Sequence, residues 1–294
     1  MYKFLHKADL LILNWIEDLP DKKGGLFQSF VFLTLLKLKK FSRIKIVWTL
    51  HNKYSHNSSK FYIKKLLVSS LLKRSDIIIT HSTEGIKFAE TLHPGVSSRI
   101  FYFPHPVVPL NGFVKKNFDK KYDILIWGTL SPYKAIDIFL EFLAKRKALN
   151  KYRILIAGKS VNPEFFMKLK KYENENIEIR NQFIENDELV AMIQQSKVTL
   201  FTYSGDSVLS SGALIDSISY GAVVFGPDTG AFGEMGRAGV IRTYESLEDL
   251  FVLLEQMDQL DNSGIPERIS EFIKAHTWSK FGEAFREKLK SIDQ

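Results

Sequence analysis

The chain has 294 residues, of which 45% are hydrophobic and 25% charged. At ~100–200 residues per domain, this length suggests two domains, and the composition excludes a disordered or fibrous chain. It contains no cysteine, which excludes disulfides, thiolate metal sites and cysteine nucleophiles. Its 41 Lys and Arg outnumber 33 Asp and Glu, for a net charge of +8, which favours an anionic partner such as nucleic acid, an acidic membrane surface or a phosphorylated ligand.

The first residues lack the features of a secretion signal, and no segment is predicted to cross a membrane. Asp9 interrupts the apolar stretch within Met1–Leu13, and no small-residue cleavage site follows. The apolar run Leu26–Leu38 contains polar residues and is shorter than the ~20 residues that span a bilayer. We therefore expect a cytoplasmic protein.

Short apolar runs in the first third of the chain predict parallel strands that are buried on both faces. The segments between them have the spacing of helices, and the alternation is typical of an α/β domain. The predicted strands are Leu10–Leu13, Ile44–Thr49, Ile77–Thr80 and Ile100–Phe103, and the predicted helices are Leu26–Lys40, Ser59–Lys73 and Glu84–Leu92.

The stretch Pro104–Lys121 breaks this alternation with prolines, a glycine and a lysine-rich run, which is typical of a linker. We predict a first domain over 1–108, a linker over 109–121, a second domain over 122–275 and a C-terminal helix over 276–294 that could pack back on the first domain. Two consecutive doubly wound parallel-sheet domains are the simplest fold that fits.

The alternation resumes after the linker. The predicted strands are Asp123–Trp127, Arg153–Ala157, Ile177–Ile179, Val198–Phe201 and Ala222–Phe225. The predicted helices are Ala135–Ala148, Pro163–Tyr172, Asn186–Gln195, Gly212–Tyr220 and helical segments from Ser246 to the end. Because ligands of such folds bind beyond the carboxyl ends of the strands, we expect the site in the loops that follow the strands.

Two segments of the second domain have the chemistry of an anion site. In GTLSPYK, Gly128 permits a tight turn and Lys134 places a cation at the mouth of a cleft, where a diphosphate could lie. The alternative is a solvated lysine at the start of a helix. In SSGAL, the backbone N–H groups, the hydroxyls of Ser210 and Ser211 and the close approach allowed by Gly212 form a second anion site, or the serines cap the helix.

The order of several motifs resembles the nucleotide-binding domain of GT-B glycosyltransferases, in particular the retaining family 4 (group 1) enzymes of bacterial surface polysaccharide synthesis. The motifs are ILIWGTLSPYKAID, ILIAGK, NQFIENDELVAMIQQSKVTLFTY, SSGALIDSISYGAVVFGPDTGAFGEM and HTWSKFGEAF. The resemblance implies two Rossmann-like domains that face each other across a cleft. It also implies a nucleotide-sugar substrate that binds without a cofactor or a metal.

The resemblance assigns roles to further residues of the second domain. Phe183 and Ile184 correspond to residues that hold the nucleotide base, although a core phenylalanine is an equal alternative, and Tyr203 would border the same pocket. Thr129 stands where the family has a cation. Val208 and Asp216 stand where it has two glutamates, of which the second contacts the ribose. Gly230 and Glu234 resemble a flexible loop under the nucleotide.

Histidines follow the strands of the first domain. The resemblance implies that His51 contacts the donor sugar and phosphate. His56, His81 with Ser82, and His105 each have a structural explanation that is at least as good as a functional one. The spacing of His51 and His56 does not favour a metal site.

The expected function is transfer of a sugar from a nucleotide-sugar to a hydroxyl of a glycan or a lipid-linked acceptor. Retention of anomeric configuration is implied by the resemblance. Inversion would need a base, for which Glu17 or Asp18 are candidates. The acceptor-side candidates are Asn14, Glu17, Asp18 and Asn52. The alternatives are a nucleotide-sugar 2-epimerase and a nucleotide-binding subunit that needs a partner; nucleic-acid binding ranks last, because no recognition module is present.

The helix predicted over Ser59–Lys73 has apolar residues among basic ones. It could rest on anionic lipid at the inner face of the membrane, or it is a packed helix with a solvated basic side. Relative to the family, the first domain lacks an opening strand and helix before Ala8. We expect a compact first domain, a partner that supplies the missing part, or a sequence from which that part has been lost.

Overall fold

The structure is a computed structural model that describes residues 8–39, 43–53, 60–109, 119–203 and 208–292. The chain forms two compact units. The first contains the residues up to His105, a short segment that ends at Ser210, and the residues from Ser279 onward; the second contains Pro106–Gly205 and Ser211–Trp278. Val208 and Leu209, which the sequence places in the second domain, therefore belong to the first unit.

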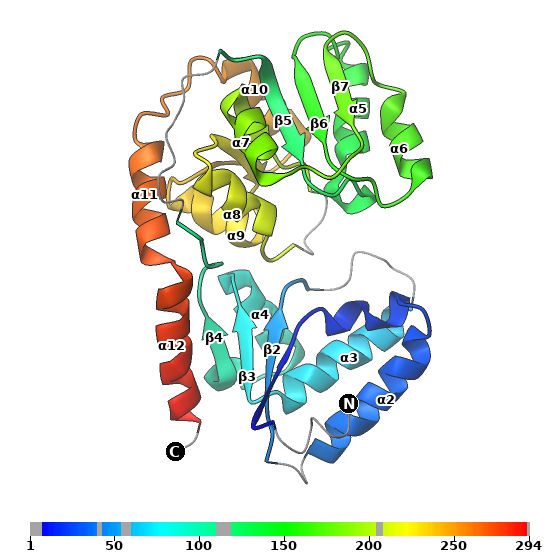
Figure 1. Ribbon diagram of the computed structural model, residues 1–294, viewed down its shortest axis with the longest axis vertical. Helices are drawn as coiled ribbons and strands as arrows, with labels where there is room; N and C mark the ends of the chain where they lie inside the picture. The colour runs from blue at the N-terminus through cyan, green and yellow to red at the C-terminus, as the bar shows by residue number, and fades with distance from the viewer. Residues whose placement is uncertain (1–7, 40–42, 54–59, 110–118, 204–207, 293–294) are drawn as a thin grey trace. The chain divides into compact units, whose positions relative to one another are not determined.

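The first unit is built on a parallel sheet whose strands follow one another in chain order, β1-β2-β3-β4 (Figure 1). Because every parallel crossover is right-handed, the connecting helices lie on one face of this sheet. The strands are β1 (Leu10–Leu13), β2 (Lys45–Leu50), β3 (Ile77–Thr80) and β4 (Ile100–Tyr102). The connections are a short 3-10 helix η1 (Ile16–Asp21), α2 (Gly25–Leu38), α3 (Phe61–Arg74), α4 (Thr83–Leu92) and η3 (Val96–Arg99).

Alternate side chains of the strands form two cores. Trp48, Leu50 and Ile78 pack with residues of the connecting helices on one face, and Leu209 is buried among them. Val47, Ile79 and Phe101 point to the other face, where they contact Phe281 and Phe285 of the C-terminal helix α12 (Trp278–Ser291). Both faces of the sheet are thus covered, which explains why its strands lack polar alternation.

The second unit has a six-stranded parallel sheet of order β10-β9-β8-β5-β6-β7. Its strands are β5 (Tyr122–Trp127), β6 (Ile154–Ala157), β7 (Ile177–Arg180), β8 (Ser196–Leu200), β9 (Val224–Pro227) and β10 (Arg242–Tyr244). Its helices are η4 (Pro132–Lys134), α5 (Ile136–Lys145), α6 (Pro163–Lys170), α7 (Asn186–Gln194), α8 (Gly212–Ser219), α9 (Gly230–Arg237), α10 (Leu247–Gln256) and α11 (Ile265–Ala275). The strand order reverses between β5 and β8.

The predicted strands and helices are confirmed with small shifts of their ends, but the three 3-10 helices, helix α9 and strand β10 were not predicted. The residues from Gly230 onward form helix α9 instead of a loop, because Ala231, Phe232 and Met235 are buried on one side of it. The short strand β10 completes one edge of the sheet. No helix of the described residues is long and apolar enough to cross a membrane.

Candidate functional site

The reversal of strand order in the second unit creates a position where the loops after β5 and β8 diverge. Open α/β sheets bind ligands at such a position, beyond the carboxyl ends of the strands. Gly128 follows β5, Tyr203 lies beyond β8, and α8 begins at Gly212. The sequence-predicted residues Gly128, Lys134, Tyr203 and Ser211 therefore come together here.

Lys134 is buried beside this position, with 5% of its surface exposed. Its Nζ donates to the carbonyl oxygen of Trp127 at 2.9 Å and lies 5.9 Å from the centroid of the Tyr203 ring. No carboxylate of the described residues pairs with it, and burial lowers the pKa of Lys134 to about 8. Both sequence interpretations are corrected, because the ammonium group is neither at an open mouth nor solvated; it is a desolvated cation that lacks a counter-charge.

The local backbone explains the burial of Lys134. The residue ends the 3-10 helix η4, and Ala135 after it adopts a left-handed conformation with φ 51°. The hydroxyl of Thr202 donates to the carbonyl oxygen of Lys134 at 2.5 Å. These features hold the lysine over the end of β5, where a Cβ on Gly128 would lie 2.7 Å from Nζ.

Gly128 and Gly158 allow the two loops to approach each other closely. Gly128 has φ +94°, in the region that favours glycine. A Cβ on Gly158 would lie 1.9 Å from the carbonyl oxygen of Gly128, so no other residue fits there without moving the backbone. The glycine of ILIAGK thus shapes the loop that carries Lys134.

The N-terminus of α8 lies on the other side of Lys134. The Ser211 hydroxyl accepts from the backbone N–H of Leu214 at 3.3 Å, so the predicted N-cap is confirmed, and it also bonds to the Tyr203 hydroxyl at 3.1 Å. A Cβ on Gly212 would meet nothing within 4 Å, so the space in front of the helix is open. The hydroxyl oxygen of Ser210, a residue of the first unit, is buried and has no hydrogen-bond partner among the described residues.

The remaining predicted residues of the second unit differ in exposure. Asp216 lies at an exposed position of α8. Neighbouring atoms still desolvate its carboxyl in part, which raises the pKa of Asp216. Thr129 is exposed beside Gly128. Glu234 lies on α9, and Gly230 begins that helix with φ +53°. Gly230 thus begins a helix and is not part of a flexible loop.

Phe183 and Ile184 lie in the loop between β7 and α7. Phe183 is 73% exposed, so the alternative of a core phenylalanine is wrong. Ile184 is half-buried. An exposed aromatic ring beyond the carboxyl end of a strand offers a face on which a planar base can stack.

Replacing Phe183 with Ala should weaken binding of UDP or GDP by about 5- to 150-fold, because stacking on an aromatic ring contributes about 1–3 kcal/mol per base. Isothermal titration calorimetry measures this effect. The melting temperature should not change, because the side chain is exposed. Phe166→Ala is unsuitable as a control because the Phe166 ring packs on the core. Met167 is an exposed apolar residue of α6, so Met167→Ala should leave nucleotide affinity unchanged. Equal affinities for Phe183→Ala and the parent would remove Phe183 from the site.

The first unit carries a second group of functional side chains at the carboxyl ends of its strands. The ring of His51 stacks on Trp15 at 4.0 Å, and its Nε2 lies 3.1 Å from the Asn14 amide oxygen. His81 lies 6.3 Å from His51 and 4.9 Å from His105, between ring centroids. Trp15 was not among the predicted residues, although its position two residues after β1 is a signal that could have indicated it.

Burial keeps His51 and His81 neutral. It lowers the pKa of His51 to about 3 and that of His81 to about 4, with the neighbouring imidazoles adding to the effect. If Nε2 of His51 donates to the amide oxygen of Asn14, Nδ1 is an acceptor, and no described residue donates to it. His81 donates through Nδ1 to the carbonyl oxygen of Phe103 at 2.8 Å, which supports its structural explanation.

The acceptor-side candidates differ in their exposure. Asn14 is exposed, and Asp18 is half-buried in η1. Asn52 is buried and forms an antiparallel bridge with Val208, so both residues connect backbone segments of the first unit. Glu17 is completely buried. Because its carboxyl cannot reach a substrate oxygen, the prediction of Glu17 as a base or acceptor ligand is corrected.

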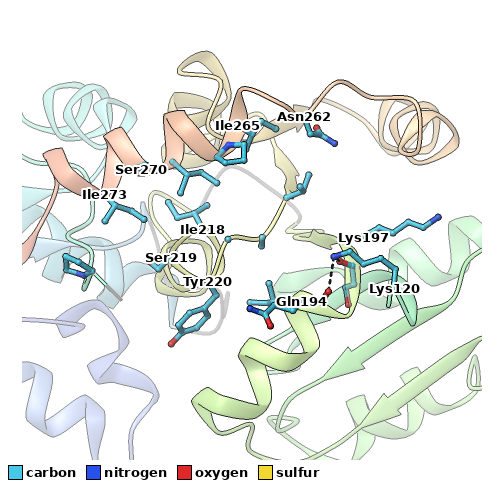
Figure 2. Close-up of a pocket in the computed structure, with 18 of the residues that line it drawn as sticks. Lys120, Gln194, Lys197, Ile218, Ser219, Tyr220, Asn262, Ile265, Ser270 and Ile273 are labelled. Atoms are coloured by element: carbon cyan, nitrogen blue, oxygen red, sulfur yellow. Dashed lines mark hydrogen bonds between the residues drawn. The ribbon is translucent and has the colours of Figure 1, made fainter. Parts of the chain in front are cut away.

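The remaining observations concern metal binding and a groove on the second unit. No group of three His, Asp or Glu side chains among the described residues could hold a metal ion; His56 lies outside the described residues. A groove of about 700 Å³ lies on the second unit between α11 and the amino ends of β8 and β9 (Figure 2). Lys120 and Lys197 line it, so it occupies the opposite edge of the sheet from Gly128 and Tyr203.

A family of known sequences matches the part of the chain that contains Gly128, Lys134 and Ser211. Residues 110–240 match the family described as group 1 glycosyl transferases. No curated protein matches the chain in sequence. The two units have the GT-B fold, and residues 110–240 are similar to the group 1 glycosyl transferases. The suspected resemblance is thereby confirmed at the level of group 1.

Solved structures of glycosyltransferases share the fold at low sequence identity. The HepE protein of Anabaena, in complex with UDP and glucose, superposes with a TM-score of 0.70 at 13% identity, over 98% of this chain and 80% of that one. The α,α-trehalose-phosphate synthase (UDP-forming) of Burkholderia vietnamiensis has a TM-score of 0.69 at 11% identity, over 99% and 74%. The pneumococcal O-GlcNAc transferase GtfA, in complex with UDP and GlcNAc, has a TM-score of 0.65 at 13% identity, over 99% and 59%.

Proposed function

We propose that this glycosyltransferase moves a hexosyl group from a nucleoside diphosphate sugar to a hydroxyl of a glycan or lipid-linked acceptor in cell-surface polysaccharide synthesis, on the cytoplasmic side of the membrane. It would act with retention of configuration and without a metal. The bond between the anomeric carbon and the diphosphate breaks, and the acceptor oxygen bonds to that carbon on the same face. The acceptor proton leaves with the nucleoside diphosphate.

The single observation that carries this proposal is the desolvated ammonium group of Lys134 beside the N-terminus of α8, which pairs with no carboxylate of the described residues. A buried cation without a counter-charge is costly, and a diphosphate would supply that charge. The positive end of α8 and its open N–H groups add a second source of attraction. Both groups would stabilise the negative charge that grows on the leaving diphosphate, and they require no metal to do so.

We assign further roles to residues within each unit. In the second unit, Phe183 and Ile184 would hold the base, Tyr203 and Ser211 would border the phosphates, and Asp216 would accept hydrogen bonds from the ribose. In the first unit, His51 would position the sugar. Because His51 stays neutral, its Nδ1 can accept a hydrogen bond from a sugar hydroxyl without adding charge. The UDP bound to HepE and GtfA makes UDP-sugars the first donors to test.

The reaction is tested by measuring UDP or GDP release from a panel of nucleotide-sugars, with and without glycan or polyprenyl diphosphate-linked acceptors. We expect release that depends on an acceptor and persists in EDTA. A 2-epimerase would instead isomerise or hydrolyse its substrate without an acceptor. A nucleotide-binding subunit would bind the donor and turn it over only with its partner. If the protein binds none of the nucleotide-sugars tested, all three functions are refuted.

A further inference from the structure

The outer side of α2 in the first unit is apolar. Phe27 is 73% exposed, Phe30 69% and Leu38 52%, and Leu35 is exposed beside them. Residues 27, 30, 34 and 38 follow one another at helical spacing and share one side of the helix, opposite the buried Ser29 and Leu36. The polar member of this row, Thr34, donates its hydroxyl to the carbonyl oxygen of Phe30 at 2.9 Å.

Helix α3 extends this apolar surface. Tyr62 is 86% exposed and Leu66 53%, one turn further along the same side. Helices α2 and α3 are neighbours on one face of the sheet, so their outer sides point away from it together (Figure 1). Six large exposed apolar side chains on adjacent helices exceed the scattered exposure that is normal for a surface. We call this surface the α2/α3 face: Phe27, Phe30, Leu35, Leu38, Tyr62 and Leu66.

A basic pocket of about 520 Å³ lies at the C-terminal ends of the same two helices. Its lining contains five cations and a single carboxylate, that of Asp76. Lys39 pairs with Asp76 at 2.5 Å, and Arg99 donates to the carbonyl oxygen of Ser75 at 2.6 Å. The other cations, whose side chains have no hydrogen bond or ion pair to another described residue, are Lys37, Lys73 and Arg74.

The basic pocket and the α2/α3 face are continuous. Lys37 precedes Leu38 on α2, and Lys73 lies on the side of α3 that carries Tyr62 and Leu66, two turns beyond Leu66. In contrast, the buried Lys64 pairs with Asp21 at 2.5 Å, and Lys60 donates to the carbonyl oxygen of Pro20. Two of the basic residues predicted on the side of α3 therefore hold η1 in place. The cations that lack a partner among the described residues lie at one end of the apolar surface.

We propose that the α2/α3 face docks on an anionic lipid bilayer, with its aromatic and leucine side chains at the level of the acyl boundary and the basic pocket against lipid phosphates. Exposed aromatic and leucine residues that adjoin lysines are typical of interfacial helices. The core of a protein interface is instead depleted in lysine, which disfavours a second copy of the chain. The inference rests on the proposed function, because a lipid-linked acceptor is available only at a membrane.

The test is sedimentation of the protein with vesicles of phosphatidylcholine alone or mixed with phosphatidylglycerol. The parent protein should sediment with the anionic vesicles and much less with the neutral ones, and salt should weaken its binding. Phe27→Glu/Phe30→Glu should lower the partition coefficient by more than about tenfold. Lys37→Glu/Lys73→Glu should abolish the preference for anionic vesicles, because each substitution reverses a charge near the headgroups.

Two matched controls place charges elsewhere. Val161→Glu/Met167→Glu alters exposed apolar residues of the second unit, and Lys87→Glu reverses an exposed lysine of α4; both should bind vesicles as the parent does. The proposal is overturned if the parent stays in solution with anionic vesicles, or if the α2/α3 variants bind equally well. It is also overturned if light scattering shows a parent dimer that Phe27→Glu/Phe30→Glu converts to a monomer.

Nucleotide-sugar binding without vesicles separates this inference from the proposed function. The α2/α3 variants should bind donor as the parent does, because no residue of that face belongs to the donor site. Vesicle binding without donor binding by the parent would refute the proposed function alone. Donor binding and acceptor-dependent turnover without vesicle binding would refute the docking surface alone.

Discussion

Replacing Lys134 with Met should lower kcat for donor turnover by about 100-fold or more, the cost typical of removing one group that stabilises developing charge. Met approximates the volume of the lysine side chain, so no large cavity replaces it. Stability should stay the same or increase, because the variant no longer desolvates a cation. Steady-state release of nucleoside diphosphate and thermal unfolding measure the two effects. Lys171→Met, at an exposed position after α6, is the matched control and should change neither.

The pH dependence of stability gives an independent check on Lys134. Between pH of about 8 and the ordinary pKa of 10.5, the unfolded chain keeps the lysine proton while the folded chain loses it. The lysine therefore contributes a rise in the free energy of unfolding over this range, which Lys134→Met should lack. A bound diphosphate favours the protonated lysine, so nucleotide affinity should fall as pH rises above about 8. Unchanged turnover in the variant would remove Lys134 from the donor site.

Replacing Glu17 with Gln should stabilise the first unit by about 3 kcal/mol above neutral pH. Burial raises the pKa of Glu17 to about 7 from 4.5, and neither carboxyl oxygen has a well-aligned hydrogen-bond partner among the described residues. The unfolded chain loses this proton near pH 4.5 and the folded chain near pH 7. The carboxyl therefore costs progressively more stability between these values, and the neutral amide does not.

Urea unfolding at several pH values tests this prediction. Below about pH 4.5 the parent and Glu17→Gln should be equally stable, and the difference should widen up to about pH 7 and then stay constant. A difference that does not vary with pH would mean that Glu17 is not a buried, titrating carboxyl.

The apolar runs made most of the fold predictable, because strands that are buried on both faces leave little ambiguity in the sequence. Helix α9 was missed because three glycines within Gly230–Arg237 lower its helix propensity, and the burial of Phe232 overrides that cost. Its identity as a helix depends on tertiary packing, which a local pattern does not contain.

The positions of the donor-site residues were predictable, but their environments were not. Lys134 follows a strand and a glycine, which suggests a ligand; its burial depends on η4 and on the bond from Thr202, which lies far along the chain. Glu17 follows β1 in the same way, yet η1 packs between α2 and α3 and encloses it. A polar residue after a strand can therefore be a ligand or an isolated buried group, and only the tertiary contacts distinguish the two.

The discontinuous makeup of the first unit has a consequence for its synthesis on the ribosome. Leu209 fills one core of that unit, and α12 covers the other face of its sheet with Phe281 and Phe285. A nascent chain that ends at His105 has neither, so Val47, Ile79 and Phe101 would remain uncovered. The first unit thus completes its folding only after α12 has been translated, and expression of residues 1–105 alone should yield an aggregation-prone fragment.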